Sequence, residues 1–205
     1  EADDLWSVES EQTEKRGSVT SDEREARFGQ KAVSLLLTGL TGSGKTTIAY
    51  ALERRLFDMG RAAVVLDGVN MRRGLTKELG FTAEEKSENL RRSSEVAKLM
   101  NGAGLICVCA FVAPSEDVRQ KAAQSVGADQ FLTIHLDAPV DVCRERDENG
   151  MYAKADAGEI SNFPGVSFDY EPPVDPALKL NTAIFSVEEC VDKIIALLEE
   201  KDALE

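Results

Sequence analysis

The chain has 205 residues, of which 42% are hydrophobic and 30% charged, and its formal net charge is −13. This length and composition predict one globular domain with a sizeable core. The acidic balance argues against nucleic acid or a membrane surface as a partner, because both are polyanionic and repel a negative protein. A small anion remains compatible with it, since a local cluster of N–H groups and basic side chains can oppose the overall field.

The cysteine and histidine content argues against a zinc site or a disulfide framework. No two cysteines form a C-x-x-C pair, and the chain has a single histidine, His135, which we expect to be a satisfied core residue. Buried thiols in a reducing, cytoplasmic compartment are the simplest interpretation. The longest apolar run, 105–113, is too short to span a bilayer, and no signal peptide is visible. The four cysteines are Cys107, Cys109, Cys143 and Cys190.

The N-terminal part of the chain is polar and charged. We expect residues 1–19 to be a tail or linker and residues 20–205 to form the folded domain. A short helix is predicted from about Ser21 to Phe28, with Thr20 or Ser21 as its cap.

Apolar runs then alternate with helical patterns. The helical patterns predict helices at 44–59, 84–101, 116–126 and 140–146, and a last helix capped by Ser186. The apolar runs predict strands at 33–38, 62–67, 105–112 and 131–137. This alternation is typical of a three-layer α/β fold with a central parallel sheet, which binds ligands at the carboxyl ends of its strands.

Residues 147–176 break the pattern with glycines, four prolines and irregularly spaced aromatics. A segment this long without regular structure is usually a lid or a binding loop.

A phosphate-binding loop is predicted where the first strand meets the first long helix. The spacing Gly39-x-x-x-x-Gly44-Lys45-Thr46 fits the P-loop pattern, and the context of strand before and helix after is present. Lys45 can reach the β- and γ-phosphates of ATP, and the Thr46 hydroxyl can ligate Mg²⁺. Backbone N–H groups and the helix N-terminus complete an anion site. The residues expected to hold ATP are Gly39, Leu40, Thr41, Gly42, Ser43, Gly44, Lys45, Thr46 and Thr47.

A carboxylate and a group of cations are expected opposite this loop. Asp67 ends the second predicted strand, where it can orient Mg²⁺ or accept a proton from an attacking hydroxyl. Arg72 and Arg73 follow it and suit forked contacts with a second anionic substrate. The next helix adds further candidates, whose arginines could instead form solvated pairs with neighbouring glutamates. These candidates are Lys86, Asn89, Arg91 and Arg92.

Several blocks in a fixed order make residues 20–205 resemble the adenylylsulfate (APS) kinases. They include "GLTGSGKTTIA", "LDGVNMRRGL", "ENLRRSSEVAKL", "DAPVDVCRERD" and "GMYAKADAGEISNFPGV". The resemblance implies a P-loop kinase that uses ATP with Mg²⁺ to phosphorylate the 3′-hydroxyl of adenosine 5′-phosphosulfate, giving PAPS. It also implies a homodimer and makes a fused ATP sulfurylase domain plausible.

The resemblance assigns roles to single residues. It makes Asp67 a candidate base, places Arg146 near the ATP adenine, and makes 151–170 a lid that closes over both nucleotides. Lys86 stands at the position of a substrate-binding arginine. The positions implied to hold APS are Asn70, Arg72 and Asn89, together with Phe81 and Phe163, which sandwich its adenine.

Five residues depart from the family pattern around this site. Aspartate, arginine, serine, lysine and arginine of the family are replaced here, in chain order, by Val69, Lys86, Ala113, Asn149 and Asp156. The sequence therefore leaves three interpretations open: an active APS kinase, a kinase for a different hydroxylated anion, or a weakened nucleotide-binding domain that regulates a fused or partner ATP sulfurylase.

Overall fold

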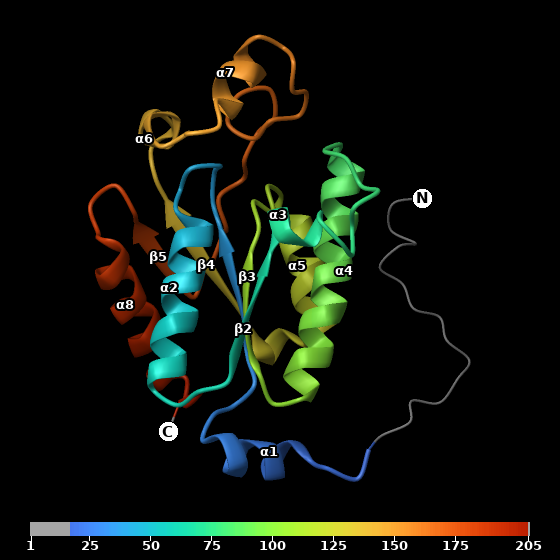
Figure 1. Ribbon diagram of the computed structural model, residues 1–205, viewed down its shortest axis with the longest axis vertical. Coiled ribbons are helices and arrows are strands. Elements are labelled where there is room, and N and C mark those ends of the chain that lie inside the picture. Colours follow the sequence, from blue (N-terminus) through green and yellow to red (C-terminus); the bar gives the residue numbers. More distant parts are fainter. Residues whose placement is uncertain (1–16, 205) are drawn as a thin grey trace.

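A five-stranded parallel sheet forms the centre of the protein in the computed structural model, which describes residues 17–204. Most of the predicted tail, residues 1–16, lies outside the described residues. The strand order is β2-β3-β1-β4-β5, so that the first strand lies in the middle (Figure 1). The strands are β1 Ser34–Thr38, β2 Ala63–Asp67, β3 Ile106–Ala110, β4 Phe131–Asp137 and β5 Leu178–Asn181.

The two innermost strands are apolar because both of their faces are covered. Every residue of β1 and β3 is buried. Leu35 and Leu37 face one layer of helices, whereas Leu36 faces the other. This is why the sequence shows continuous apolar runs here rather than an alternating pattern.

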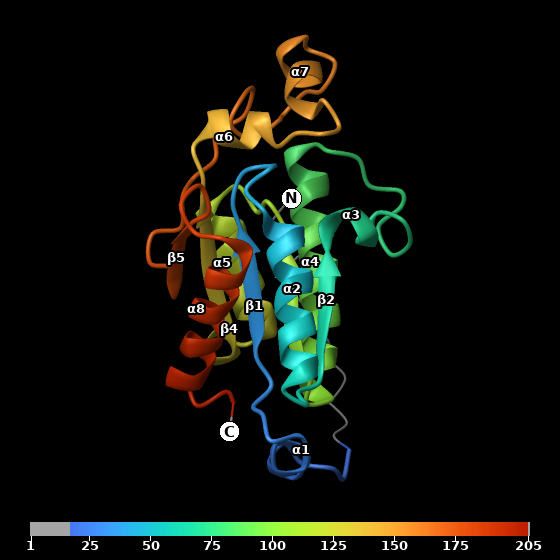
Figure 2. The same ribbon diagram turned by 60° about the vertical axis from the view of Figure 1, so that its left-hand side comes forward.

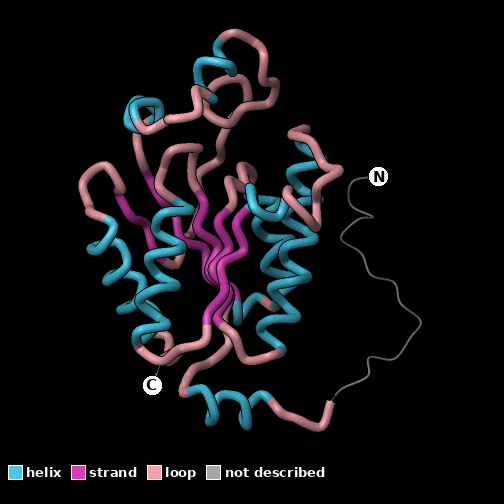
Figure 3. Tube along the Cα trace, viewed as in Figure 1, coloured by secondary structure: helices cyan, strands magenta, loops and turns pink. Residues whose placement is uncertain are grey.

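Helices pack on both faces of the sheet and complete three layers (Figures 1 and 3). On one face lie α2 (Lys45–Asp58) and α8 (Val187–Glu200), and on the other α4 (Ala83–Gly102) and α5 (Glu116–Val126). The predicted α/β fold with a central parallel sheet is confirmed. The short elements are α1 Ser21–Phe28, α3 Gly68–Met71, α6 Val140–Glu145, α7 Met151–Asp156 and the 3-10 turn η2 Ala128–Gln130.

The starts of three helices are fixed by capping boxes, in which a hydroxyl and a glutamate satisfy each other's backbone N–H groups. Thr20 caps α1 in this way, Thr82 caps α4 and Ser186 caps α8. The cap of α4 holds the end of that helix beside the carboxyl edge of the sheet.

Two elements differ from the expectations. Strand β5 was not predicted, because "LKLN" is short, lies at the sheet edge beside β4, and has only Leu180 buried. The segment 147–176 was expected to be irregular, yet it contains helix α7. Figure 2 shows α6 and α7 beyond the carboxyl ends of the strands, where the phosphate loop also lies.

Candidate active site

The loop between β1 and α2 has a backbone that only glycine can adopt at key points. Gly39 and Gly42 have φ angles of 155° and 85°. A Cβ atom at Gly39 would collide with the carbonyl oxygen of Leu136, and one at Gly42 would lie 2.5 Å from that of Cys143. The close approach of these two segments therefore explains the glycine spacing.

Ser43 carries an unpaired polar atom inside this loop. The residue is fully buried, and within residues 17–204 its Oγ has no hydrogen-bond partner. Its backbone carbonyl, in contrast, accepts a hydrogen bond from the Thr182 hydroxyl over 3.0 Å. A buried hydroxyl without a protein partner in a loop of this shape fits an oxygen atom of a bound phosphate.

Lys45 points back into the loop. Its ammonium donates to the carbonyl oxygens of Gly39 at 2.9 Å and Leu40 at 2.7 Å. Although the side chain as a whole is only partly buried, its ammonium is enclosed. This burial lowers the pKa of Lys45 to about 8, against the opposing effects of Cys143 and Asp67. A phosphate placed here would favour the charged form.

Thr46 and Asp67 bring α2 and β2 together. The Thr46 hydroxyl donates to Oδ2 of Asp67 over 2.7 Å. Oδ1 of Asp67 accepts from the amides of Val69 at 2.9 Å and Asn70 at 3.1 Å, which caps α3. A hydroxyl and a carboxylate are oxygen ligands of the kind that Mg²⁺ prefers.

No group of three or more His, Cys, Asp or Glu side chains that could hold a metal occurs among residues 17–204. A cation at the Thr46–Asp67 pair would therefore complete its shell with substrate oxygens and water, as Mg²⁺ commonly does.

Arg72 and Phe81 form a platform on the loop that follows α3. The guanidinium lies 4.6 Å from the ring centroid of Phe81, and its Nη2 donates to the carbonyl of Gly80 over 3.0 Å. Phe81 is 54% exposed, so part of its ring remains accessible. Burial lowers the pKa of Arg72, and its Nε is buried without a partner among the described residues. The arginine is thus held in place by its stacking and its carbonyl contact.

The two predicted asparagines differ in their surroundings. Asn70 is exposed and donates from Nδ2 to the Tyr50 hydroxyl over 2.8 Å, which ties α3 to α2. Asn89 is 2% exposed, and its Oδ1 accepts from the hydroxyl of Thr76 over 2.7 Å. Tyr50 and Thr76 could not be singled out from the sequence, since both contacts are made between separate elements.

The segment 151–170, which is predicted to be a lid, contacts the phosphate loop through Tyr152. Its hydroxyl donates to the carbonyl of Thr41 over 2.8 Å. Phe163 packs edge-on against the Tyr152 ring, with centroids 4.9 Å apart, and is only 5% exposed. In this conformation Phe163 offers little ring face to a ligand, unlike Phe81.

Lys86 joins the lid to α4. Its ammonium donates to the carbonyl of Asn162 and lies 5.8 Å from the ring centroid of Phe168. Burial, together with the charge of Arg72, lowers the pKa of Lys86. Lys86 thus lies between the lid and the platform formed by Arg72 and Phe81.

Arg146 lies at the end of α6, on the other side of the loop. Its Nη2 donates to the carbonyl of Thr182 over 2.8 Å. Because the Thr182 hydroxyl bonds to Ser43, Arg146 is connected to the phosphate loop through one residue.

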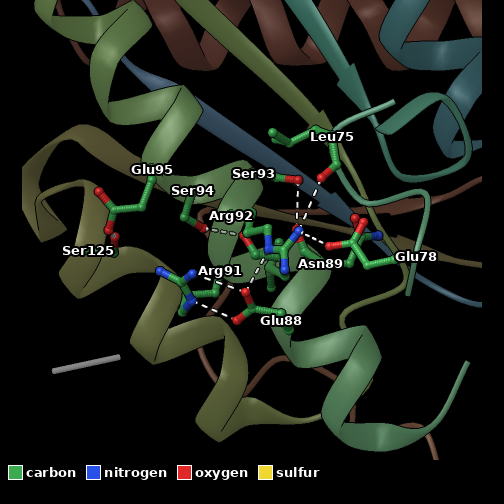
Figure 4. A network of polar contacts seen from close by, with 11 residues as sticks. Leu75, Glu78, Glu88, Asn89, Arg91, Arg92, Ser93, Ser94, Glu95 and Ser125 are labelled. Carbon is green, nitrogen blue, oxygen red and sulfur yellow. Dashed lines mark hydrogen bonds and ion pairs between the residues drawn. The ribbon is translucent and has the colours of Figure 1, made fainter. Parts of the chain in front are cut away.

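Arg91 and Arg92 do not face the site as free cations. The Nε atom of each donates to Glu88 over 2.7 Å, and Arg92 also contacts Glu78 and the carbonyl of Leu75 (Figure 4). The alternative left open by the sequence, pairing with a neighbouring glutamate, is therefore correct for these two residues. The reason is local, because Glu88 is three and four residues before them on the same helix.

The departures from the family pattern are accommodated in different ways. Val69 is 71% exposed on α3. Asp156 forms a forked ion pair with Arg144, at 2.5 and 3.0 Å. Ala113 is buried with a φ of 42°, and its carbonyl accepts from Arg119 over 2.6 Å. Asn149 is exposed, and nothing in the structure explains that substitution.

His135 is buried on strand β4, as expected of a core residue. It is 4% exposed and stacks on Tyr170 at 6.0 Å, but it has no hydrogen-bond partner among the described residues. It lines a cavity of about 340 Å³ between the phosphate loop, the end of β4 and the segment 165–172, together with Leu40, Asp137, Gly165, Asp169 and Tyr170.

The site combines a loop shaped to enclose phosphate, a hydroxyl–carboxylate pair beside that loop, and the segment 151–170 above it. Together with the fold, these features define the class, which is that of the P-loop kinases. Within this class, a family model described as adenylylsulphate kinase matches residues 31–181. This match covers more than half of the chain, and the protein belongs to the adenylylsulphate kinase family.

Individual relatives agree with this assignment. The adenylyl-sulfate kinase of Phocaeicola vulgatus is 46% identical over 180 residues, covering 88% of this chain and 88% of that protein. The bifunctional enzyme CysN/CysC of Rhodopirellula baltica is 57% identical over 184 residues, or 90% of this chain, but the chain spans only 28% of that relative's length.

A solved structure gives the same result. The Mycobacterium tuberculosis APS kinase CysC, in complex with AMPPNP and APS, superimposes with a TM-score of 0.79 at 39% identity, covering 83% of this chain and 99% of that one. As for membranes, the helices of the described residues include none with the length and apolar character needed to cross one.

Proposed function

We propose that the protein transfers the γ-phosphoryl group of ATP to the 3′-hydroxyl of APS, giving PAPS. The observation that carries this proposal is the position of Asp67. It contacts Thr46 of the phosphate loop on one side and caps α3 on the other, and α3 leads directly to the Arg72–Phe81 platform. One carboxylate thus lies between a site for a triphosphate and a site for a second, anionic substrate.

ATP would occupy the phosphate loop. The amides of Gly39–Thr47 would surround the phosphates, and the Ser43 hydroxyl would find there the partner that it lacks in the protein. The Lys45 ammonium would exchange the carbonyls of Gly39 and Leu40 for β- and γ-phosphate oxygens. Arg146, linked to the loop through Thr182, would lie beside the adenine.

Thr46 and Asp67 would hold Mg²⁺ in different ways. The Thr46 hydroxyl oxygen would bind the metal directly. The Asp67 carboxylate would accept hydrogen bonds from that hydroxyl and from water molecules on the metal. When bound, Mg²⁺ supplies charge neutralisation at the β- and γ-phosphate oxygens. Both oxygens of Asp67 already accept hydrogen bonds, from Thr46, Val69 and Asn70. This favours a role in orienting the metal and the attacking hydroxyl over a role as a strong base.

APS would bind between the platform and the lid. The polar contacts would come from Asn70, Arg72, Lys86 and Asn89, and the open part of the Phe81 ring would stack on the adenine. Phe163 would complete the adenine sandwich only after leaving its buried position against Tyr152. Lid closure would then exclude water from the phosphoryl transfer.

A second function is supported by the bifunctional relative. Because this chain aligns with only part of CysN/CysC, it can act as one part of a longer sulfate-activating protein. In that case the domain could bind nucleotide and regulate a fused or partner ATP sulfurylase. The two functions differ in one outcome, the formation of PAPS.

A coupled assay for PAPS, with the purified chain, ATP, Mg²⁺ and APS, tests the proposal. We expect PAPS formation that depends on APS and is abolished in Lys45→Met. Nucleotide binding by calorimetry without any PAPS formation would instead support the regulatory function. A different hydroxylated anion as acceptor would show as ADP release with that compound and none with APS.

We further propose that residues 20–205 form the kinase domain after a 1–19 tail, that the enzyme is a homodimer, and that it works in the cytoplasm. All four cysteines are free and buried, which suits a reducing compartment.

A further inference from the structure

Asn89 is predicted to bind APS, and its amide could present either an oxygen or a nitrogen to a ligand. In the structure the amide has its oxygen turned towards Thr76. Oδ1 of Asn89 accepts a hydrogen bond from the hydroxyl of Thr76 over 2.7 Å, and Thr76 itself is fully buried. The acceptor end of the amide is therefore already occupied by the protein.

The donor end remains available. Nδ2 of Asn89 has no hydrogen-bond acceptor among residues 17–204. It is nevertheless not one of the side-chain atoms in this part of the chain that are both fully buried and without a partner. Such an atom must reach the solvent-accessible surface, so the 2% exposure of Asn89 includes its Nδ2. The backbone of Asn89 is also fixed, since its carbonyl accepts from the Ser93 hydroxyl over 2.7 Å.

We propose that Thr76 is a positioning residue that orients the Asn89 amide so that it donates, through Nδ2, to an acceptor atom of the second substrate. Thr76 does not touch the substrate in this arrangement. It sets the polarity of the one contact that Asn89 makes, and so selects a substrate with an oxygen or an unprotonated ring nitrogen at that point. The inference rests on the proposed function, because it presumes that APS reaches Asn89.

A purely structural role for Thr76 must be separated from this one. The loop 72–81 is also attached to α4 by Arg92, which donates to the carbonyl of Leu75 over 3.1 Å and contacts Glu78 (Figure 4). Glu78→Ala weakens this second attachment without touching Thr76 or Asn89. It is therefore a matched control for loosening of the loop.

The experiment compares steady-state kinetics of the wild-type chain with Thr76→Val, Thr76→Ser and Glu78→Ala. Valine has the shape of threonine but cannot donate, which leaves Oδ1 of Asn89 unpaired and the amide free to turn. We expect KM for APS to rise about tenfold in Thr76→Val, the effect of losing about one good hydrogen bond. KM for ATP and kcat should stay within about twofold. Thr76→Ser restores the donor, and both it and Glu78→Ala should behave like the wild type.

Asn89→Asp provides a test that does not depend on the folding of Thr76→Val. It keeps the acceptor for Thr76 and replaces the Nδ2 donor by an oxygen. We expect calorimetry to show APS binding weakened by about tenfold or more, with ATP binding unchanged.

Three results would overturn the role of Thr76. They are a KM for APS in Thr76→Val within about twofold of the wild type, an equal rise of that KM in Glu78→Ala, and undiminished APS binding by Asn89→Asp. Absence of PAPS from the wild type would count against the proposed function instead. Calorimetry of APS binding to the same variants would then still decide the role of Thr76.

Discussion

The Thr46 hydroxyl, in the first turn of α2, donates to Oδ2 of Asp67 at the end of β2, over 2.7 Å. The other oxygen of the same carboxylate caps α3 through the amides of Val69 and Asn70. One buried side chain thus fixes the relative positions of the phosphate loop, the second strand and the helix that leads to Arg72. An asparagine at this position keeps one oxygen that can cap α3, so loss of the charge should affect chemistry more than it affects folding.

Asp67→Asn tests this relationship. We expect PAPS formation to fall by about a hundredfold or more, because a neutral amide is a poor metal-orienting group and can donate where the carboxylate accepts. The affinity for ATP without Mg²⁺ should change by less than about threefold. Rates measured over a range of Mg²⁺ concentrations, beside calorimetry with and without the metal, check both statements.

Asp58→Asn is the matched control, since Asp58 forms an exposed pair with Arg54 at the far end of α2. It should leave the rate unchanged. If Asp67→Asn retained more than about a third of the wild-type rate, the carboxylate would not have the proposed role.

Val69→Asp restores the aspartate that the family pattern places two residues after Asp67. Val69 is 71% exposed, and its contact with Asp67 is made by its backbone amide rather than its side chain. We therefore expect kcat in the PAPS assay to change by less than about threefold. A much larger gain would mean that the side chain at this position reaches the metal, contrary to its exposure here.

Asp156 forms an ion pair between the lid and α6. It pairs with Arg144, whose guanidinium lies 5.0 Å from the ring centroid of Tyr152. Both partners are substantially exposed, so solvent screens the pair and its contribution to the free energy of unfolding should be small. We expect Asp156→Arg to accelerate hydrogen exchange in α7 through like-charge repulsion, and the exchanged pair Arg144→Asp with Asp156→Arg to return it towards the wild-type rate. Additive effects of the two substitutions would show that the ion pair does not hold α7.

Tyr152→Phe removes only the hydroxyl that reaches the carbonyl of Thr41 and keeps the ring against Phe163. We expect kcat for PAPS to fall by about three- to tenfold, because the lid loses a hydrogen bond to the phosphate loop. The melting temperature should shift by only a few degrees. The control is Ser125→Ala, which removes a hydrogen bond to Glu95 on the helical layer. Equal rates in Tyr152→Phe and the wild type would argue against a functional contact between lid and loop.

The sequence predicted the elements whose pattern is local and strong. Helices 21–28 and 116–126 and strand 131–137 occur with the predicted bounds, and the first of them begins at the capping box of Thr20. The phosphate loop was likewise predicted from the P-loop spacing together with the strand before it and the helix after it. The edge strand β5 was not, since an edge strand needs only one buried side chain and "LKLN" supplies only Leu180.

The contacts that orient the site could not be predicted, because they join residues distant in sequence. Tyr152 and Thr41 are 111 positions apart, and Thr76 and Asn89 are 13 apart on different elements. The sequence also does not show whether the aspartate at position 156 disrupts the site or forms a new ion pair. That depends on Arg144, which packing of α6 against α7 brings near.

His135 predicts a pH dependence of stability. Burial lowers its pKa below the usual 6.5, aided by Lys179 and Arg119 and opposed by Asp137. The unfolded chain therefore binds a proton near pH 6.5 that the folded chain resists, and the free energy of unfolding decreases as the pH falls below that value. His135→Gln, which does not titrate, should lose this contribution. Urea unfolding at pH 7.5 and 5.5 should show a smaller decrease in stability for His135→Gln than for the wild type. Parallel decreases in the two proteins would mean that other groups carry the acid sensitivity.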